Sequence, residues 1–321
     1  MDKEHIFDLL TQPGERLTFL MQWLKSKMWS LENFNQLPPE TYMEQGEKAV
    51  YEVEELIANA TWGLYDEIVA ASTKAQNLAK ALSSDNPISV VIFDGASVRE
   101  LPLFEKLARE TGFEILISGY GFAALPSDTD FFIEQRLLEK RLAPSQLPIR
   151  KELKEKGVRT FYYDSPTRNF ELTSSDDNLL LWSHFPDGTY KDLSARFSSH
   201  FGEMLKLYGT VWKNIVMQIP KEHEIIITSD HGYIFLGPGL ESTTAGEAAK
   251  TLNQNRYRFF ADDEPLPEEV PGLHVIGEKR LAMLQGRIKN RPQGPSGNKA
   301  YRHGGLSLME MLTPWLEIKR K

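Results

Sequence analysis

The sequence predicts an α/β protein with a mainly parallel central sheet flanked by helices, preceded by a helical N-terminal region. Two observations lead to this prediction. In residues 1–84, apolar side chains recur at spacings of three and four, as in amphipathic helices, and no strand pattern interrupts them. From residue 85 onward, short apolar runs alternate with helical stretches, which is typical of parallel strands joined by helices. We therefore expect a helical region over 1–84 and an α/β domain over 85–321.

The helical region contains two periodic segments, separated by the Pro38-Pro39 pair and closed by a turn cluster at 83–87. Tryptophans in this region offer anchors for a protein partner, although tryptophans at helical spacing more often belong to a core. The apolar positions of the two segments are Leu17, Leu20, Met21, Leu24 and Met28, then Val53, Leu56, Ile57, Ala60, Leu64 and Ile68, and the tryptophans are Trp23, Trp29 and Trp62.

The α/β domain shows its expected strands as apolar runs and its expected helices as periodic stretches between some of them. Ligands of parallel α/β sheets bind beyond the carboxyl ends of the strands, so polar residues that directly follow these runs are the first candidates for a site. The expected strands cover 88–93, 114–118, 178–185 and 224–228, the clearest helices cover 101–111 and 131–141, and an exposed acidic loop is expected at 262–269.

Composition narrows the possible chemistry. The chain has 37 Lys and Arg against 45 Asp and Glu, a net charge of -8, so it is not built to coat nucleic acid or an anionic membrane as a whole. It contains no cysteine, which excludes disulfides, thiolate ligands and a cysteine nucleophile and fits a reducing compartment. No signal-peptide pattern and no apolar run of membrane-spanning length is present, so we expect a cytoplasmic protein without a membrane partner.

Two expected strands end on side chains that can bind a metal. Asp94 follows the run 88–93 and precedes a glycine, and Asp230-His231-Gly232 follows the run 224–228. One such aspartate alone would be read as a turn or helix-cap residue. Two strand ends with this chemistry favour a shared site at the sheet edge.

A hydroxyl residue and two further polar residues stand in loops of the same domain. Ser127, with Asp130 three residues later, resembles a helix cap, and a hydroxyl at such a position is also a usable nucleophile. Asp187 lies in a Pro-Asp-Gly turn, where local sequence favours a turn residue over a ligand. His303 precedes a glycine pair, and Ser307 with Glu310 is typical of the capping box of a last helix.

Taken in order, these motifs resemble the PglZ domain of the alkaline phosphatase superfamily. The resemblance covers roughly residues 88–318 and leaves out the helical region. Its most specific parts are Asp-His-Gly at 230–232 and Arg-His-Gly-Gly-Leu-Ser at 302–307, followed by Phe-Asp-Gly at 93–95, Leu-Pro-Ser at 125–127 and Pro-Asp-Gly at 186–188. It implies an alkaline-phosphatase-like domain over 85–321.

The resemblance implies a phosphohydrolase with one or two divalent metal ions, usually zinc and with manganese as an alternative. By residue, it implies Asp94, Asp230 and His231 as ligands of one ion, and Asp187 and His303 as ligands of the other. Carboxylates and imidazoles suit these metals without any cysteine.

The nucleophile and the second metal site depart from the family pattern. The resemblance implies Ser127 as nucleophile where the family commonly has threonine, and Thr129 is a rival. Lys191 stands where the superfamily often has a histidine ligand, and a protonated lysine cannot bind a metal. His184 or Asp192 would then replace that ligand, or Lys191 would offer its charge to a phosphate.

A basic stretch leads into His303. Residues 279–302 hold seven basic residues and no acidic one, so they would either steer a phosphodiester toward the metals or form a solvated loop. The candidate phosphate contacts are Arg291 and Arg302, with Arg280 and Arg287 as further members of the stretch.

The resemblance favours a metal-dependent phosphodiesterase with a serine nucleophile, acting on nucleotides or oligonucleotides in a bacterial phage-defence or regulatory setting. An alternative is a catalytically decayed PglZ-like module that serves as a binding or scaffold component and contacts a protein partner through residues 1–84. A third reading keeps the enzyme and changes the reaction to sulfate ester hydrolysis or phosphate transfer.

Overall fold

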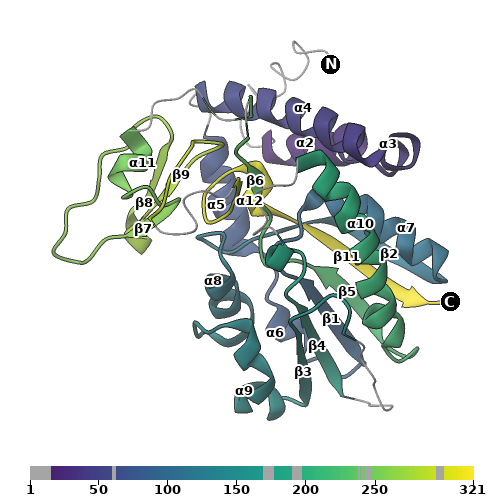
Figure 1. Ribbon diagram of the computed structural model, residues 1–321. Coiled ribbons are helices and arrows are strands. Elements are labelled where there is room, and N and C mark those ends of the chain that lie inside the picture. Colours follow the sequence, from purple (N-terminus) through teal and green to yellow (C-terminus); the bar gives the residue numbers. More distant parts are fainter. Residues whose placement is uncertain are drawn as a thin grey trace.

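A computed structural model describes residues 16–59, 63–168, 177–189, 197–237, 239–240, 242, 247–293 and 300–321 (Figure 1). Its central feature is a six-stranded sheet of order β2-β11-β5-β1-β4-β3. Strands β5, β1, β4 and β3 are parallel, while β11 is antiparallel to both β2 and β5. The strands are β1 (Ile88–Phe93), β2 (Phe113–Phe122), β3 (Val158–Tyr163), β4 (Asn178–Ser183), β5 (Glu224–Thr228) and β11 (Leu312–Arg320).

Helices cover both faces of this sheet, which confirms the predicted fold class. Alternate residues of β1 show it: Val91 and Phe93 belong to the larger apolar core, while Val90 and Ile92 belong to a second core on the opposite face. The larger core includes residues of α7 (Leu101–Glu110) and α10 (Phe197–Asn214), and the second includes residues of α6 (Leu78–Ala81), α8 (Thr129–Ile133) and α9 (Lys151–Lys154).

The N-terminal helices pack on the larger core. That core includes residues from Leu17 to Ile318, so the helices and the sheet share one interior. The second periodic segment of the sequence is two helices, and Gly63 begins the latter of them with a φ of 68°. The helices are α2 (Arg16–Trp23) with its π-helical continuation η1 (Leu24–Met28), α3 (Leu31–Gln36), α4 (Pro39–Asn59) and α5 (Leu64–Lys74). Trp23 and Trp29 are buried, and Trp62 lies outside the described residues.

Buried charges bind α4 to the sheet domain. Glu47 of α4 accepts hydrogen bonds from Arg99 Nε at 2.6 Å and from Arg287 Nη1 at 2.8 Å, and Arg287 Nε contacts Glu54 at 2.7 Å. All four side chains are at most 3% exposed. Burial alone would raise the pKa of Glu47, but the two guanidinium groups lower it. Each charge is therefore paired, as buried charges must be.

The end of the chain differs from the expected last helix. Ser307 caps a helix as predicted, accepting from Glu310 N at 3.1 Å, but α12 is only Leu308–Met311. The residues after it form β11, which pairs with β2 and β5 in the interior of the sheet. The Glu310 carboxylate pairs with Arg256 instead of closing a capping box.

Shorter elements complete the described structure. A three-stranded sheet of order β7-β9-β8 stands beside the main one, and β6 pairs with β10 (Figure 1). Residues 262–269 form a loop, as expected. The remaining elements are η2 (Val98–Glu100), η3 (Glu134–Leu138), η4 (Pro144–Ile149), η5 (Asp187–Thr189), β6 (Ile234–Phe235), η6 (Val216–Gln218), α11 (Glu247–Thr251), β7 (Tyr257–Phe259), β8 (Leu273–Ile276), η7 (Gly277–Lys279), β9 (Leu281–Leu284) and β10 (Tyr301–Arg302). Among the helices described, none is long and apolar enough to cross a membrane.

Candidate active site

Three neighbouring strands bring the candidate ligands together. Strand β1 lies between β4 and β5, and all three run in the same direction. Asp94 directly follows β1, His184 directly follows β4, and Asp230 and His231 come just after β5. Because parallel strands end at one edge of a sheet, these side chains converge there.

Asp94, Asp230 and His231 form a buried group, the ligand trio, whose ligand atoms lie within 4.8 Å of one another. His231 Nε2 is 3.9 Å from Asp94 Oδ1 and 3.6 Å from Asp230 Oδ2. The other ring nitrogen, Nδ1, is 2.8 Å from the Gly232 carbonyl oxygen, so Nδ1 carries the proton and donates it there. Nε2 is buried and has no hydrogen-bond partner among the residues that the structure describes.

This arrangement fits a divalent cation. A lone pair on Nε2 facing two carboxylates is repulsive unless a proton or a metal ion stands between them, and a carbonyl that fixes the other ring nitrogen is the usual support of a histidine ligand. Two carboxylates and one imidazole suit zinc or manganese.

Two glycines allow this geometry. Gly95 has a φ of 73°, in the left-handed region that favours glycine, and its N–H donates to Asp230 Oδ1 at 3.0 Å. A Cβ on Gly232 would lie 2.1 Å from the Met309 carbonyl oxygen. The Asp-Gly and Asp-His-Gly motifs thus contain glycine because the backbone turns sharply at one position and another segment comes close at the other.

Burial and the neighbouring charges shift two pKa values of the ligand trio. Burial, followed by the charge of Asp230, raises the pKa of Asp94 to about 7. Burial alone would lower the pKa of His231, but Asp230 and Asp94 raise it to about 9. Near neutral pH the metal-free ligand trio therefore holds protons that a metal ion would have to displace.

We expect metal affinity to rise with pH. Both folded-state pKa values lie above the ordinary ones, so the protons are held at low pH and are lost as pH rises. The proton of His231 should add up to about tenfold in affinity per pH unit below about pH 9, and the proton of Asp94 the same below about pH 7. Calorimetric titration with Mn²⁺ in buffers of different ionisation enthalpy counts the released protons. An affinity that does not change with pH, with no proton release, would contradict these pKa directions.

A second group of potential ligands shares Asp94. Asp94, His184 and Asp187 also place ligand atoms within 4.8 Å of one another. Asp94 Oδ2 is 3.2 Å from His184 Nδ1 and accepts a hydrogen bond from Trp182 Nε1, also at 3.2 Å. His184 is one of the two residues that the sequence offers as a replacement for the histidine ligand missing at Lys191. Lys191 and Asp192 lie outside the described residues.

The two candidate nucleophiles have different partners. The Ser127 hydroxyl is fully buried, donates to the Gly305 carbonyl at 2.8 Å and accepts from Gly304 N at 3.0 Å. The Thr129 hydroxyl donates to Asp230 Oδ2 at 2.6 Å. Thr129 therefore contacts the ligand trio, whereas Ser127 holds the glycine pair after His303. Asp128, not Ser127, is the N-cap of α8.

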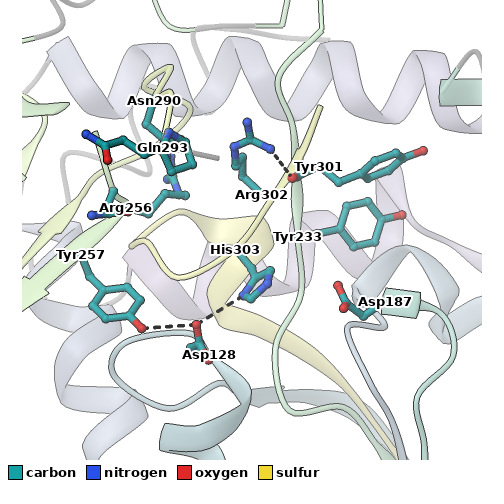
Figure 2. A pocket seen from close by; sticks show the side chains of 12 residues that line it. Asp128, Asp187, Tyr233, Arg256, Tyr257, Asn290, Gln293, Tyr301, Arg302 and His303 are labelled. Atoms are coloured by element: carbon teal, nitrogen blue, oxygen red, sulfur yellow. Dashed lines mark hydrogen bonds and ion pairs between the residues drawn. The ribbon is translucent and has the colours of Figure 1, made fainter. Parts of the chain in front are cut away.

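His303 stands between the ligand trio and a pocket. Its ring stacks on His231 with centroids 4.0 Å apart and planes 9° apart. Its Nδ1 is 3.3 Å from the Ser127 carbonyl oxygen and 4.0 Å from Asp128 Oδ2. Asp128 also accepts from the Tyr257 hydroxyl at 3.4 Å (Figure 2). The ring of His303 is thus held by neighbours on two sides, beside the ligand trio.

The pocket has a volume of about 530 Å³ and its lining is mixed in chemistry. Asp187 and His303 connect it to the ligand groups, Tyr257 and Tyr301 offer aromatic surface, and Arg302 supplies a positive charge (Figure 2). The pocket is large enough for a small organic ligand beside the ligand trio.

The four arginines named in the basic stretch have different surroundings. Arg302 is buried at 7% exposure, and burial followed by the charge of Arg256 lowers its pKa to about 10. Arg291 is exposed. Arg287 belongs to the buried charges under α4, and Arg280 Nε donates to Phe260 O at 3.1 Å. Of these four, Arg302 alone lines the pocket.

Sequence reasoning missed Trp182 and the pair formed by Asp128 and Tyr257. Trp182 reads as a buried strand residue, and only the neighbouring strand shows that its indole faces Asp94. Tyr257 lies 129 positions from Asp128 along the chain, so no local pattern could connect them.

No family model matches the chain, and no curated protein does. Among solved structures, the chain is similar to murine ectonucleotide pyrophosphatase/phosphodiesterase 5, with a TM-score of 0.45 and 15% identity over 72% of this chain and 87% of that one. An inactive variant of the same enzyme in complex with AMP gives a TM-score of 0.44 and 14% identity, with the same coverage.

Proposed function

We propose that this protein is a metal-dependent phosphodiester hydrolase in which Thr129 is the nucleophile. One observation carries the proposal: the Thr129 hydroxyl donates to Asp230, and Asp230 belongs with Asp94 and His231 to a buried group that fits a divalent cation. A hydroxyl, its acceptor and a metal site within contact of one another are the parts that nucleophilic attack on phosphorus requires.

Asp94, Asp230 and His231 would hold one ion, and Asp187 with His184 would complete a second site around Asp94. A bound metal lowers the pKa of the attacking hydroxyl and offsets the negative charge of the phosphate. The chain's own residues do the rest: Asp230 Oδ2 orients the Thr129 hydroxyl, and His303, stacked on His231, borders the place of the leaving group.

In the reaction that we infer, Thr129 Oγ forms a bond to phosphorus and its proton passes to Asp230 Oδ2. The bond between phosphorus and the leaving oxygen breaks, and the leaving group departs with that electron pair and takes up a proton. Water then attacks the phosphothreonine diester, which restores the Thr129 hydroxyl and releases the phosphate monoester. Two substitutions at phosphorus divide one difficult step into two easier ones.

Thr129 takes the role that the sequence gave first to Ser127. Both hydrogen-bonding directions of the Ser127 hydroxyl are used by backbone atoms, and the side chain is fully buried. Its attack would break two buried hydrogen bonds, while Thr129 already points at the ligand trio. The commoner threonine of PglZ domains agrees with this choice.

The substrate class follows from the pocket and from the PglZ resemblance. Aromatic side chains and Arg302 beside a metal group suit nucleotides or oligonucleotides, whose bases stack and whose further phosphates need a cation. We therefore propose a PglZ-like enzyme with zinc or manganese that works in the cytoplasm in a bacterial phage-defence setting. The decayed scaffold stays the alternative that an activity assay decides.

The test is hydrolysis of bis-p-nitrophenyl phosphate with added zinc or manganese. We expect metal-dependent turnover in the wild type and a loss of at least about a hundredfold in Asp230→Asn, because the substitution removes a charged metal ligand and the acceptor of the Thr129 proton. Asp262→Asn, at a fully exposed loop carboxylate, is the matched control and should leave the rate unchanged. Absence of turnover with either metal in the folded protein would favour the scaffold.

A further inference from the structure

We propose that a second pocket, on the sheet face opposite to α7 and α10, binds an organic anion with one carboxylate on an apolar, ring-sized body. This pocket, the Arg136 pocket, has a volume of about 370 Å³ and is formed by α5, α6, η3 and strands β2 and β11. It shares no lining residue with the pocket at His303.

The cation of the Arg136 pocket is buried and lacks a charge partner within the described residues. Arg136 is 5% exposed. Its Nη2 donates to the Ser72 carbonyl at 2.6 Å, and its Nε has no hydrogen-bond partner in the described part of the chain. Burial lowers the pKa of Arg136, and no neighbouring charge in that part of the chain offsets the effect.

Three other buried arginines each have a carboxylate partner, which Arg136 lacks among the described residues. Arg99, Arg287 and Arg256 each contact a buried glutamate at 2.5 to 2.8 Å. A buried charge without a partner is costly, whereas an anion placed against it would be bound with little competition from water. The charge of Arg136 therefore selects a negatively charged occupant.

The walls of the Arg136 pocket define the rest of the ligand. Trp315 and Phe132 present aromatic surface, and Leu78 adds aliphatic surface. A carboxylate could accept hydrogen bonds from the Arg136 guanidinium, while a ring packs against the two aromatic side chains.

One lining position of the Arg136 pocket is a glycine with open space beside it. A Cβ placed on Gly119 would meet nothing within 4 Å, and Gly119 pairs with Trp315 across β2 and β11. A larger side chain at 119 would therefore fill the pocket without touching Arg136. This position supplies a blocking variant that leaves the buried charge and its backbone contacts intact.

The test uses the fluorescent probe 1-anilinonaphthalene-8-sulfonate, a ring-bodied anion, titrated into the full chain under native conditions. We expect one saturable site in the wild type, at least tenfold weaker binding in Arg136→Met, and a similar loss in Gly119→Leu. Bound probe should be displaced by 2-naphthoate and at least tenfold less well by the neutral 2-naphthalenemethanol.

The variants separate the outcomes. Arg136 also bonds to backbone oxygens, so if Arg136→Met does not fold, Gly119→Leu and the two competitors decide. Unchanged probe binding in Gly119→Leu, equal displacement by the charged and the neutral competitor, or no saturable site in the wild type would each overturn the proposal. None of these readouts depends on phosphodiester hydrolysis.

Discussion

Replacing Thr129 with alanine is expected to reduce phosphodiester hydrolysis at least about a thousandfold, because removal of a nucleophile abolishes the covalent route. Thr129→Ser keeps the hydroxyl within reach of Asp230 and should retain the rate to within about tenfold. Steady-state assays with bis-p-nitrophenyl phosphate and saturating metal measure both variants. Metal titration of Thr129→Ala should stay close to the wild type, which separates loss of chemistry from loss of the ligand trio.

Ser127→Ala is the matched comparison. This variant leaves Gly304 N and Gly305 O without their buried partner, at about 1 to 3 kcal/mol of folding free energy. It removes no reacting atom, so the rate per folded molecule should fall less than about tenfold. The assignment of Thr129 would be wrong if Ser127→Ala, shown to be folded, lost activity and Thr129→Ala kept it.

Glu47→Ala is expected to lower the free energy of unfolding by about 3 to 5 kcal/mol, since it leaves two buried guanidinium groups without a shared partner. Glu47 lies between Arg99 and Arg287, and these arginines also donate to the carbonyls of Tyr233, at 3.0 Å, and Phe235, at 3.3 Å. Both carbonyls belong to the segment that follows His231. Urea denaturation followed by tryptophan fluorescence measures the change.

An exposed ion pair of similar length serves as control. Glu247 and Lys250 are 2.7 Å apart, with side chains 72% and 66% exposed, so Glu247→Ala should change stability by no more than about 0.5 kcal/mol. Equal effects of the two substitutions would show that α4 is not held to the sheet domain by these charges.

The strands that the sequence predicts best are those buried on both faces. The runs 88–93 and 224–228 agree with β1 and β5 to the residue, because a central parallel strand needs apolar side chains on both sides and reads as a continuous apolar run. β11 was missed because Pro314, Glu317 and Lys319 interrupt its apolar pattern and a helix cap precedes it. Its pairing with β2 and β5 is long-range.

The candidate site shows the same contrast between local patterns, which the sequence reveals, and long-range contacts, which it does not. Asp94, Asp230 and His231 could be named because each lies within a few residues of the end of a strand, and neighbouring parallel strands end together. Choosing between Ser127 and Thr129 could not be done locally, since they are only two residues apart at the start of α8. What separates them is the backbone of Gly304 and Gly305, 177 and 178 positions beyond Ser127.

The most direct test of the central claim is to look for the covalent intermediate. The protein would be mixed with bis-p-nitrophenyl phosphate and metal, quenched in acid during turnover, digested, and its peptides analysed by mass spectrometry. The account predicts a p-nitrophenyl phosphate ester on Thr129 and none in Thr129→Ala. An ester on Ser127, or turnover with no ester on any residue, would contradict it.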